Sequence, residues 1–266
     1  MTTLRAVGAI VLREFRRFVR QRGRLLSTVA RPLLWLFVVG SGFSGIVATT
    51  ADLSYRDYLL PGVIGMVILF SAMLAALSTV YDRELGIARM MLVAPVRRVT
   101  VVVAKVVSSA VLAAGQGLAL FVLVPVLGLG GEGAGLGTAA AGVAGTSFTL
   151  AAIGMLLASR IGSLENFAVV MNFVVFPMFF LSGALYPVAR LPEVLQVVAR
   201  ANPLTYGVDL LKHGFFGPGR GAFGGEITPW VDLAVLAAWT VGATLLAGWW
   251  FGREDRFTRV ATSSGG

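Results

Sequence analysis

Few side chains in this sequence could carry chemistry by themselves. His213 is the only histidine and there is no cysteine, so a thiol metal site, a disulfide framework and a histidine-activated nucleophile are not expected. We therefore expect no catalytic residue and no metal site, and we interpret His213 as a solvated side chain of an outer loop. No phosphate-binding loop of the Gly-x-x-x-x-Gly-Lys type occurs, so we do not expect this chain to bind ATP through one.

The segment 82–105 has the most informative arrangement of charges. Asp82 and Glu84 would lie at the start of a short helix, where carboxylates interact favourably with the helix dipole, and Pro95 would end it. Met90 and Met91 add an adaptable apolar surface. A short charged helix with exposed apolar groups is typical of a segment that docks to a soluble partner. The alternative is a helix that rests on the bilayer surface.

The elements that position these residues are predicted to cross a membrane. Six stretches of at least 20 residues contain no charged side chain: 32–51, 58–81, 106–131, 133–159, 166–189 and 233–252. A bilayer core of about 30 Å needs roughly 20 apolar residues in a helix, and the chain is 57% hydrophobic. We therefore predict an all-α membrane protein with six transmembrane helices. A single domain would cover 1–260, with the spans in 32–252 and a flexible tail at 261–266.

The placement of charge predicts the topology. A net charge of +9 could suggest nucleic-acid binding, but the basic residues follow the loops. If the N-terminus is cytoplasmic and six helices cross the membrane, 17 basic residues fall on cytoplasmic segments and 5 on outer segments. The positive-inside rule then places both termini in the cytoplasm. We expect contact with membrane lipid and no nucleic-acid partner.

Residues 1–31 are predicted to form an amphipathic helix at the membrane interface. Apolar residues from Leu4 to Phe18 recur at spacings of three and four, which is typical of a helix with one apolar face. The polar face would carry four arginines: Arg13, Arg16, Arg17 and Arg20. This helix is either a simple anchor or a lever that also touches a soluble partner.

The predicted spans contain few polar side chains and no titratable group at depth. Two amides, Gln116 and Asn172, would either form interhelical hydrogen bonds or line a pathway. The lack of deep titratable groups argues against ion-coupled transport and against an intramembrane enzyme. An aromatic face of the fifth span would suit an amphiphilic substrate, unless it faces lipid or a neighbouring helix. Its residues are Asn172, Phe176, Phe179, Phe180 and Gly183.

Three segments together resemble type-2 ATP-binding-cassette (ABC) exporter permeases, most closely the daunorubicin-resistance-like and multidrug branch. The first segment is Tyr81 to Lys105. The second comprises 177–187, Leu191-Pro192 and Asn202-Pro203-Leu204-Thr205-Tyr206. The third is Tyr58-Leu-Leu-Pro-Gly62 at the start of the second span. With the length and the six-span order, the resemblance covers nearly the whole chain.

The resemblance implies half of a transporter, with a second permease copy and two ATPase subunits as partners. The ATPase subunits would bind ATP and Mg²⁺, and this chain would hold no cofactor. The arm would be the interface helix of the family, and a short outer helix after the fifth span would be re-entrant. The coupling helix, which fits into the ATPase, would contain Asp82, Arg83, Glu84, Gly86, Arg89, Leu92, Pro95 and Arg97.

We therefore predict the membrane subunit of an ATP-driven exporter in the bacterial cytoplasmic membrane, with an amphiphilic or lipid-like substrate. The alternative is a membrane-embedded assembly or recruitment protein without transport activity. An ATPase partner would favour the exporter, and a soluble partner without a phosphate-binding loop would favour the recruiter.

Overall fold

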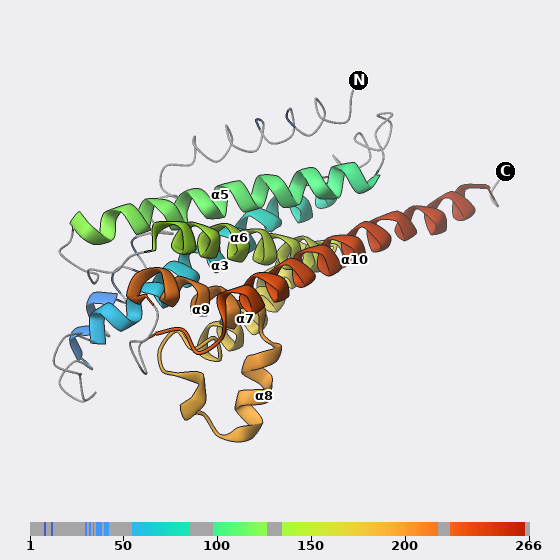
Figure 1. The fold of residues 1–266 in the computed structure, drawn as a ribbon. Helices are drawn as coiled ribbons and strands as arrows, with labels where there is room; N and C mark the ends of the chain where they lie inside the picture. The colour runs from blue at the N-terminus through green and yellow to red at the C-terminus, as the bar shows by residue number, and fades with distance from the viewer. Residues whose placement is uncertain are drawn as a thin grey trace.

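The computed structural model describes residues 55–85, 98–126, 135–217 and 224–263, together with single positions between Gly8 and Gly42. Helices dominate these residues, and none of the four ranges contains a strand (Figure 1). The predicted all-α class is therefore confirmed for the part of the chain that is described. Most of the arm 1–31 and most of the first apolar stretch, 32–51, lie outside it.

Four described helices are long and apolar enough to cross a membrane. They are α3 (Tyr55–Glu84), α5 (Arg98–Val126), α6 (Leu136–Ala158) and α10 (Pro229–Ser263). A fifth apolar helix, α7 (Leu164–Phe180), has 17 residues, about 26 Å at the usual helical rise. The structure thus shows four candidate spans among the described residues, and the count of six stays a prediction.

The centre of the bundle is α6, which packs against α3, α5, α10 and the shorter helix α9 (Pro203–Phe216) (Figure 1). Small residues make this contact close. A Cβ atom added at Gly214 of α9 would lie 2.6 Å from Ala139 of α6, and one at Gly142 of α6 would lie 3.1 Å from Leu211. The small-residue run in 139–147 therefore lets two helix backbones approach, as expected in lipid.

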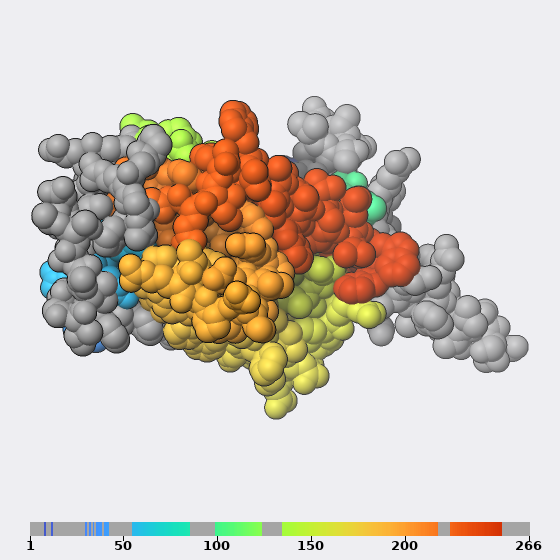
Figure 2. Space-filling view, turned by 60° about the horizontal axis from the view of Figure 1, so that its bottom comes forward, coloured from blue at the N-terminus to red at the C-terminus, as the bar shows by residue number. Residues whose placement is uncertain are grey.

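Burial differs strongly between the candidate spans. In the most apolar window of α3, 72% of the residues are buried, against 28% in α10. Exposed large apolar side chains lie on α10, including Trp230, Leu245 and Trp249, and on the short helix α8 (Glu193–Ala201). The face seen in Figure 2 contains α8 in gold beside the start of α10 in orange-red. These exposed surfaces are what lipid or another protein would cover.

The chain between α7 and α10 folds back into the bundle. A short 3₁₀ helix, η1 (Val188–Arg190), leads to α8 and then α9. Asn202 caps α9 by accepting a hydrogen bond from Leu204 N at 3.1 Å, and its Nδ2 donates to Met178 O of α7 at 2.7 Å. His213 was expected to lie in an outer loop. Instead α9 continues to Phe216 with nearly every side chain buried, and Gly217, with φ of 69°, ends it.

Three further boundaries differ from the sequence-based expectation. Asp82 and Glu84 lie in the last turn of α3 and do not begin a separate helix. The apolar run before them continues in helical conformation through the charged residues, and the helix ends at Glu84. At the other end of the loop α5 begins at Arg98, which places Lys105 in its second turn. In the C-terminal region α10 reaches Ser263, inside the segment expected to be a flexible tail.

Candidate functional site

The end of the bundle where α3 stops and α5 begins, here named the loop end, contains a buried ion pair. Lys105 Nζ donates to Asp82 Oδ2 at 2.6 Å, and the two side chains are 5% and 7% exposed. Lys105 Nζ also lies 3.4 Å from Ser78 Oγ of α3. Both ends of the 86–97 segment are therefore joined inside the bundle, because the pair links the last turn of α3 to α5.

Arg83 connects the same end of α3 to two more helices. Its Nη1 donates to the carbonyl oxygens of Ser159 at 2.9 Å and Ala158 at 3.3 Å, which are the free carbonyls at the end of α6. Its guanidinium lies 4.9 Å from the centre of the Phe251 ring of α10. Arg83 was expected to be part of the docking surface for an ATPase. The contacts instead direct it inward, where it caps α6.

Of the remaining residues predicted to form the coupling helix, the structure describes only Glu84. Glu84 is exposed at the end of α3, so it is available to a partner. The other five lie outside the described residues: Gly86, Arg89, Leu92, Pro95 and Arg97. The interface-helix arginines are also outside: Arg13, Arg16, Arg17 and Arg20. Their roles stay predictions.

The residues predicted to form one aromatic face of α7 do not all lie on the same side of the helix. Asn172 is exposed, as are Phe176 at 49% and Phe180 at 39%, and the two rings stack with centroids 6.4 Å apart. Phe179 is 3% exposed and packs in the core, so it does not share this face. The sequence analysis missed Phe173, which is 83% exposed, although its spacing from 176 and 180 follows the helical period.

Gly183 has a structural position in the turn after α7. It is buried with φ of 76°, a conformation that favours glycine. Its carbonyl accepts a hydrogen bond from Tyr58 Oη of α3 at 3.0 Å. A Cβ atom at Gly62 would lie 2.6 Å from Ala184. The structure thus brings together two segments that the sequence analysis treated separately, 58–62 and 177–187, and places Gly183 away from the exposed face of α7.

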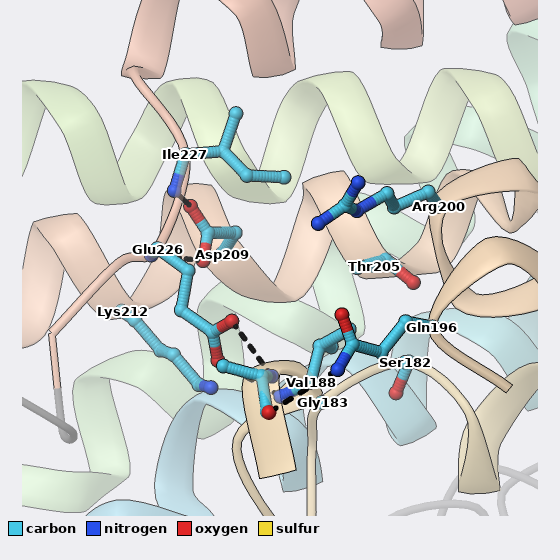
Figure 3. A pocket seen from close by; sticks show the side chains of 11 residues that line it. Ser182, Gly183, Val188, Gln196, Arg200, Thr205, Asp209, Lys212, Glu226 and Ile227 are labelled. Atoms are coloured by element: carbon cyan, nitrogen blue, oxygen red, sulfur yellow. Dashed lines mark hydrogen bonds between the residues drawn. The ribbon is translucent and has the colours of Figure 1, made fainter. Parts of the chain in front are cut away.

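A cavity of about 120 Å³ lies beside this turn, at the opposite end of the bundle from the loop end. Its walls come from the turn after α7, from η1, α8 and α9, and from the segment that precedes α10 (Figure 3). Arg200 and Lys212 face it from two sides, and the carboxylates of Asp209 and Glu226 lie between them (Figure 3).

The two carboxylates of the cavity hold the backbone around it. Asp209 accepts from Glu226 N at 2.7 Å and Ile227 N at 3.0 Å. Glu226 in turn accepts from Val188 N at 2.9 Å and Ala189 N at 3.1 Å. Burial raises the pKa of the Asp209 carboxyl, although the two backbone N–H groups and the nearby Lys212 and His213 act in the opposite direction.

Lys212 connects the cavity to α3. It is 2% exposed, and its Nζ donates to Tyr58 Oη at 3.1 Å. Burial lowers the pKa of the Lys212 amine, and Asp209 and Glu226 oppose this shift. Lys212 is one of the five basic residues expected on the outer segments. The glycines within 203–216 interrupt the apolar pattern, so the sequence did not predict a buried helix there.

His213 also lies on α9, and it is only partly exposed. Its Nε2 lies 2.6 Å from Ile227 O and 3.5 Å from Asp209 Oδ2. The expectation of a solvated loop histidine is therefore wrong. The missed signal was the spacing of Asp209 and His213, which puts both on one face of a helix.

Comparison with known proteins gives a consistent result over most of the chain. Residues 5–216 match a family described as ABC-2 type transporter. The chain is 30% identical to nodulation protein J of Rhizobium leguminosarum bv. trifolii over 190 residues, which are 71% of this chain and 72% of that protein. It is also 30% identical over 197 residues to nodulation protein J of Rhizobium meliloti (strain 1021), covering 71% and 72% of the two chains.

A second group of relatives has a different name. The putative transport permease ycf38 of Porphyra purpurea is 26% identical over 219 residues, which are 79% of this chain and 74% of that protein. The family match over residues 5–216 includes the loop end, α7 and α9.

Proposed function

Because the chain belongs to the ABC-2 type transporter family, we propose that it is the permease subunit of an ATP-driven exporter. Membrane transport is the activity of this family, and ATP hydrolysis belongs to a separate subunit. In our proposal two permease copies form the membrane unit, and two ATPase subunits bind ATP and Mg²⁺ and dock at the loop end. The loop end is then cytoplasmic, in the bacterial cytoplasmic membrane.

The observation that carries this proposal is the network at the loop end. An ATPase that moves the 86–97 segment would act directly on the ends of α3 and α5. The buried pair of Asp82 and Lys105 keeps these two ends together, and Arg83 links them to α6 and α10. Since packed helices shift as rigid bodies, a push at this segment would reach four helices at once. A protein that only recruits a partner would not need such connections.

The exposed face of α7 supports an amphiphilic or lipid-like substrate. Phe173, Phe176 and Phe180 are exposed beside the Asn172 amide, and of the long helices α7 packs only against α3 to any extent. An aromatic surface with a single amide favours apolar chains over sugars or ions. In a dimer this face would border the path between the two permeases. The resemblance to the daunorubicin-resistance-like branch supports the same substrate class.

The distribution of basic residues supports the proposed orientation. Seventeen of the basic residues lie on segments that would be cytoplasmic, which follows the positive-inside rule. Arg83 and Arg160 both lie at the loop end, and Arg160 is held 4.1 Å from the centre of the Trp250 ring.

The proposal is tested by purification with the proteins encoded beside this chain. The chain is co-expressed with its genomic neighbours, extracted in a mild detergent, and examined by native mass spectrometry and ATP turnover. We expect a complex of two permeases and two ATPases whose turnover rises when an amphiphilic substrate is present. A complex with a soluble partner that does not hydrolyse ATP would contradict the exporter and favour the recruitment protein.

A further inference from the structure

Asp232, in the first turn of α10, is a buried carboxylate without a visible partner. Its side chain is 0% exposed, and neither carboxylate oxygen has a hydrogen-bond donor among the described residues. A buried polar group without a partner is costly, and a buried charge is more costly still. Such a group either takes up a proton or binds a ligand that the protein chain itself does not supply.

Two further ligand groups point toward this carboxylate from α9. Asp209, His213 and Asp232 each offer one oxygen or nitrogen atom, and the three atoms lie within 4.8 Å of one another. The distance from His213 Nε2 to Asp209 Oδ2 is 3.5 Å. In a tetrahedral site with metal–ligand bonds of 2.0–2.2 Å, neighbouring ligands are about 3.4 Å apart. This pair therefore already has the separation that a shared ion requires.

The carbonyl of Ile227 lies on the segment that enters α10, 2.6 Å from His213 Nε2. A carbonyl only accepts hydrogen bonds, so Nε2 donates its proton there when no ion is bound, and an ion at Nε2 would replace this hydrogen bond. Asp209 holds that segment through its two backbone hydrogen bonds. The three ligand groups come from α9 and α10, so an ion among them would join the two helices.

The surrounding charges leave the cluster negative. Lys212 and Arg200 are the nearby cations, and Lys212 Nζ is directed to Tyr58 Oη of α3 at 3.1 Å. Their two charges do not balance the three carboxylates Asp209, Glu226 and Asp232. Asp209 also lines the cavity of about 120 Å³ (Figure 3), which provides a route by which a cation could reach the cluster.

We propose that Asp209, His213 and Asp232 bind a divalent transition-metal ion of the Zn²⁺ type, which fastens α9 to the first turn of α10. The donor set decides the class of ion. One imidazole nitrogen with carboxylate oxygens suits Zn²⁺, whereas Mg²⁺ and Ca²⁺ prefer oxygen ligands alone. The site lies at the opposite end of the bundle from the loop end, so its role is separate from ATPase docking.

The test is a direct measurement of bound metal on the full chain. The chain is purified in detergent with an affinity tag that contains no histidine, stripped with a chelator, and dialysed against Zn²⁺ or Mg²⁺. Metal content is read by mass spectrometry and stability by thermal unfolding. We expect one tightly bound Zn²⁺ per chain, a higher unfolding temperature with Zn²⁺, and no comparable effect of Mg²⁺.

Two variants and one control assign the metal to these residues. Asp232→Asn and His213→Gln should each weaken Zn²⁺ binding by at least about tenfold, since even the loss of an outer partner of a metal ligand costs that much. Glu193→Gln, at an exposed position in the first turn of α8, should bind Zn²⁺ as the parent chain does. If Asp232→Asn does not fold, the Zn²⁺ binding of His213→Gln alone tests the proposal.

Two results would overturn the proposal. One is Zn²⁺ binding that is unchanged in both variants, which would place the metal elsewhere. The other is a parent chain that binds no Zn²⁺ while Asp232→Asn unfolds at a higher temperature, which would mean that the two carboxylates share a proton. Metal content does not depend on an ATPase partner, so failure here is distinct from failure of the exporter proposal.

Discussion

Removal of the Arg83 guanidinium gives the sharpest test of the loop-end network. Arg83→Met keeps the length of the side chain and removes its contacts with α6 and α10. Two hydrogen bonds to the carbonyls of Ala158 and Ser159 are lost, with the contact to the Phe251 ring. A hydrogen bond to a charged group contributes about 1.5–3 kcal/mol, and a cation–π contact about 0.5–1 kcal/mol.

The partial exposure of Arg83 reduces these contributions by solvent screening. We therefore expect Arg83→Met to lower the free energy of unfolding by about 2–3 kcal/mol. The matched control is Arg160→Met at the same end of the bundle. Arg160 is exposed and lies over the Trp250 ring at 4.1 Å, so its loss should cost only about 0.5–1 kcal/mol.

The measurement is equilibrium unfolding of both variants in mixed micelles, followed by export and ATP turnover of the assembled complex. Arg83→Met should also reduce the export achieved per ATP, because the ends of α3 and α6 would no longer move together. Arg83→Lys should recover only part of the loss, since an ammonium lacks the planar fork that contacts two carbonyls. Equal destabilisation by Arg83→Met and Arg160→Met would refute the capping role.

Glu84→Gln should leave ATP turnover intact while export falls. The control is Glu165→Gln, which replaces an exposed carboxylate in the first turn of α7 and should change neither quantity. Equal export by the two variants would mean that Glu84 is not part of the docking surface. Gly183→Ala should lower the free energy of unfolding by about 1–2 kcal/mol, since φ of 76° is strained for alanine. Gly162→Ala, with nothing within 4 Å of the added Cβ, is its control in the same unfolding experiment. Phe176→Asp, at a side chain 49% exposed, should alter the relative export of several amphiphilic substrates with little loss of stability. Unchanged preference would mean that Phe176 faces only lipid.

The sequence was informative where one local property decides the structure. Long uncharged stretches identified the candidate spans that are described, because a bilayer core excludes charge over a known length. Small side chains in 139–147 let two helices approach closely in lipid, and Gly142 and Ala139 make this contact. The docking role of the 86–97 segment rests on resemblance and stays a prediction.

Helix ends and side-chain directions were harder to predict from the sequence. Asp82 appeared to begin a new helix because charges usually end an apolar span. In the structure Lys105 lies 2.6 Å away, so the charge is matched inside the bundle and α3 continues past it. Phe179 appeared to share a face with Phe176 and Phe180. Which of three neighbouring rings points to the core depends on where α3 packs, and no local pattern contains that information.

The sequence by itself determined that this chain is helical, that it crosses a membrane, and that its basic residues favour one orientation, because each follows from the cost of exposing charge or backbone to hydrocarbon. Only the tertiary structure decided that α9 lies inside the bundle. It also brought Asp232 to Asp209 and His213 across a gap of 19 residues or more in the sequence. Such a cluster depends on the packing of two helices against α6. Residues that meet only through packing have no characteristic spacing along the sequence, so the sequence alone does not predict that they lie together.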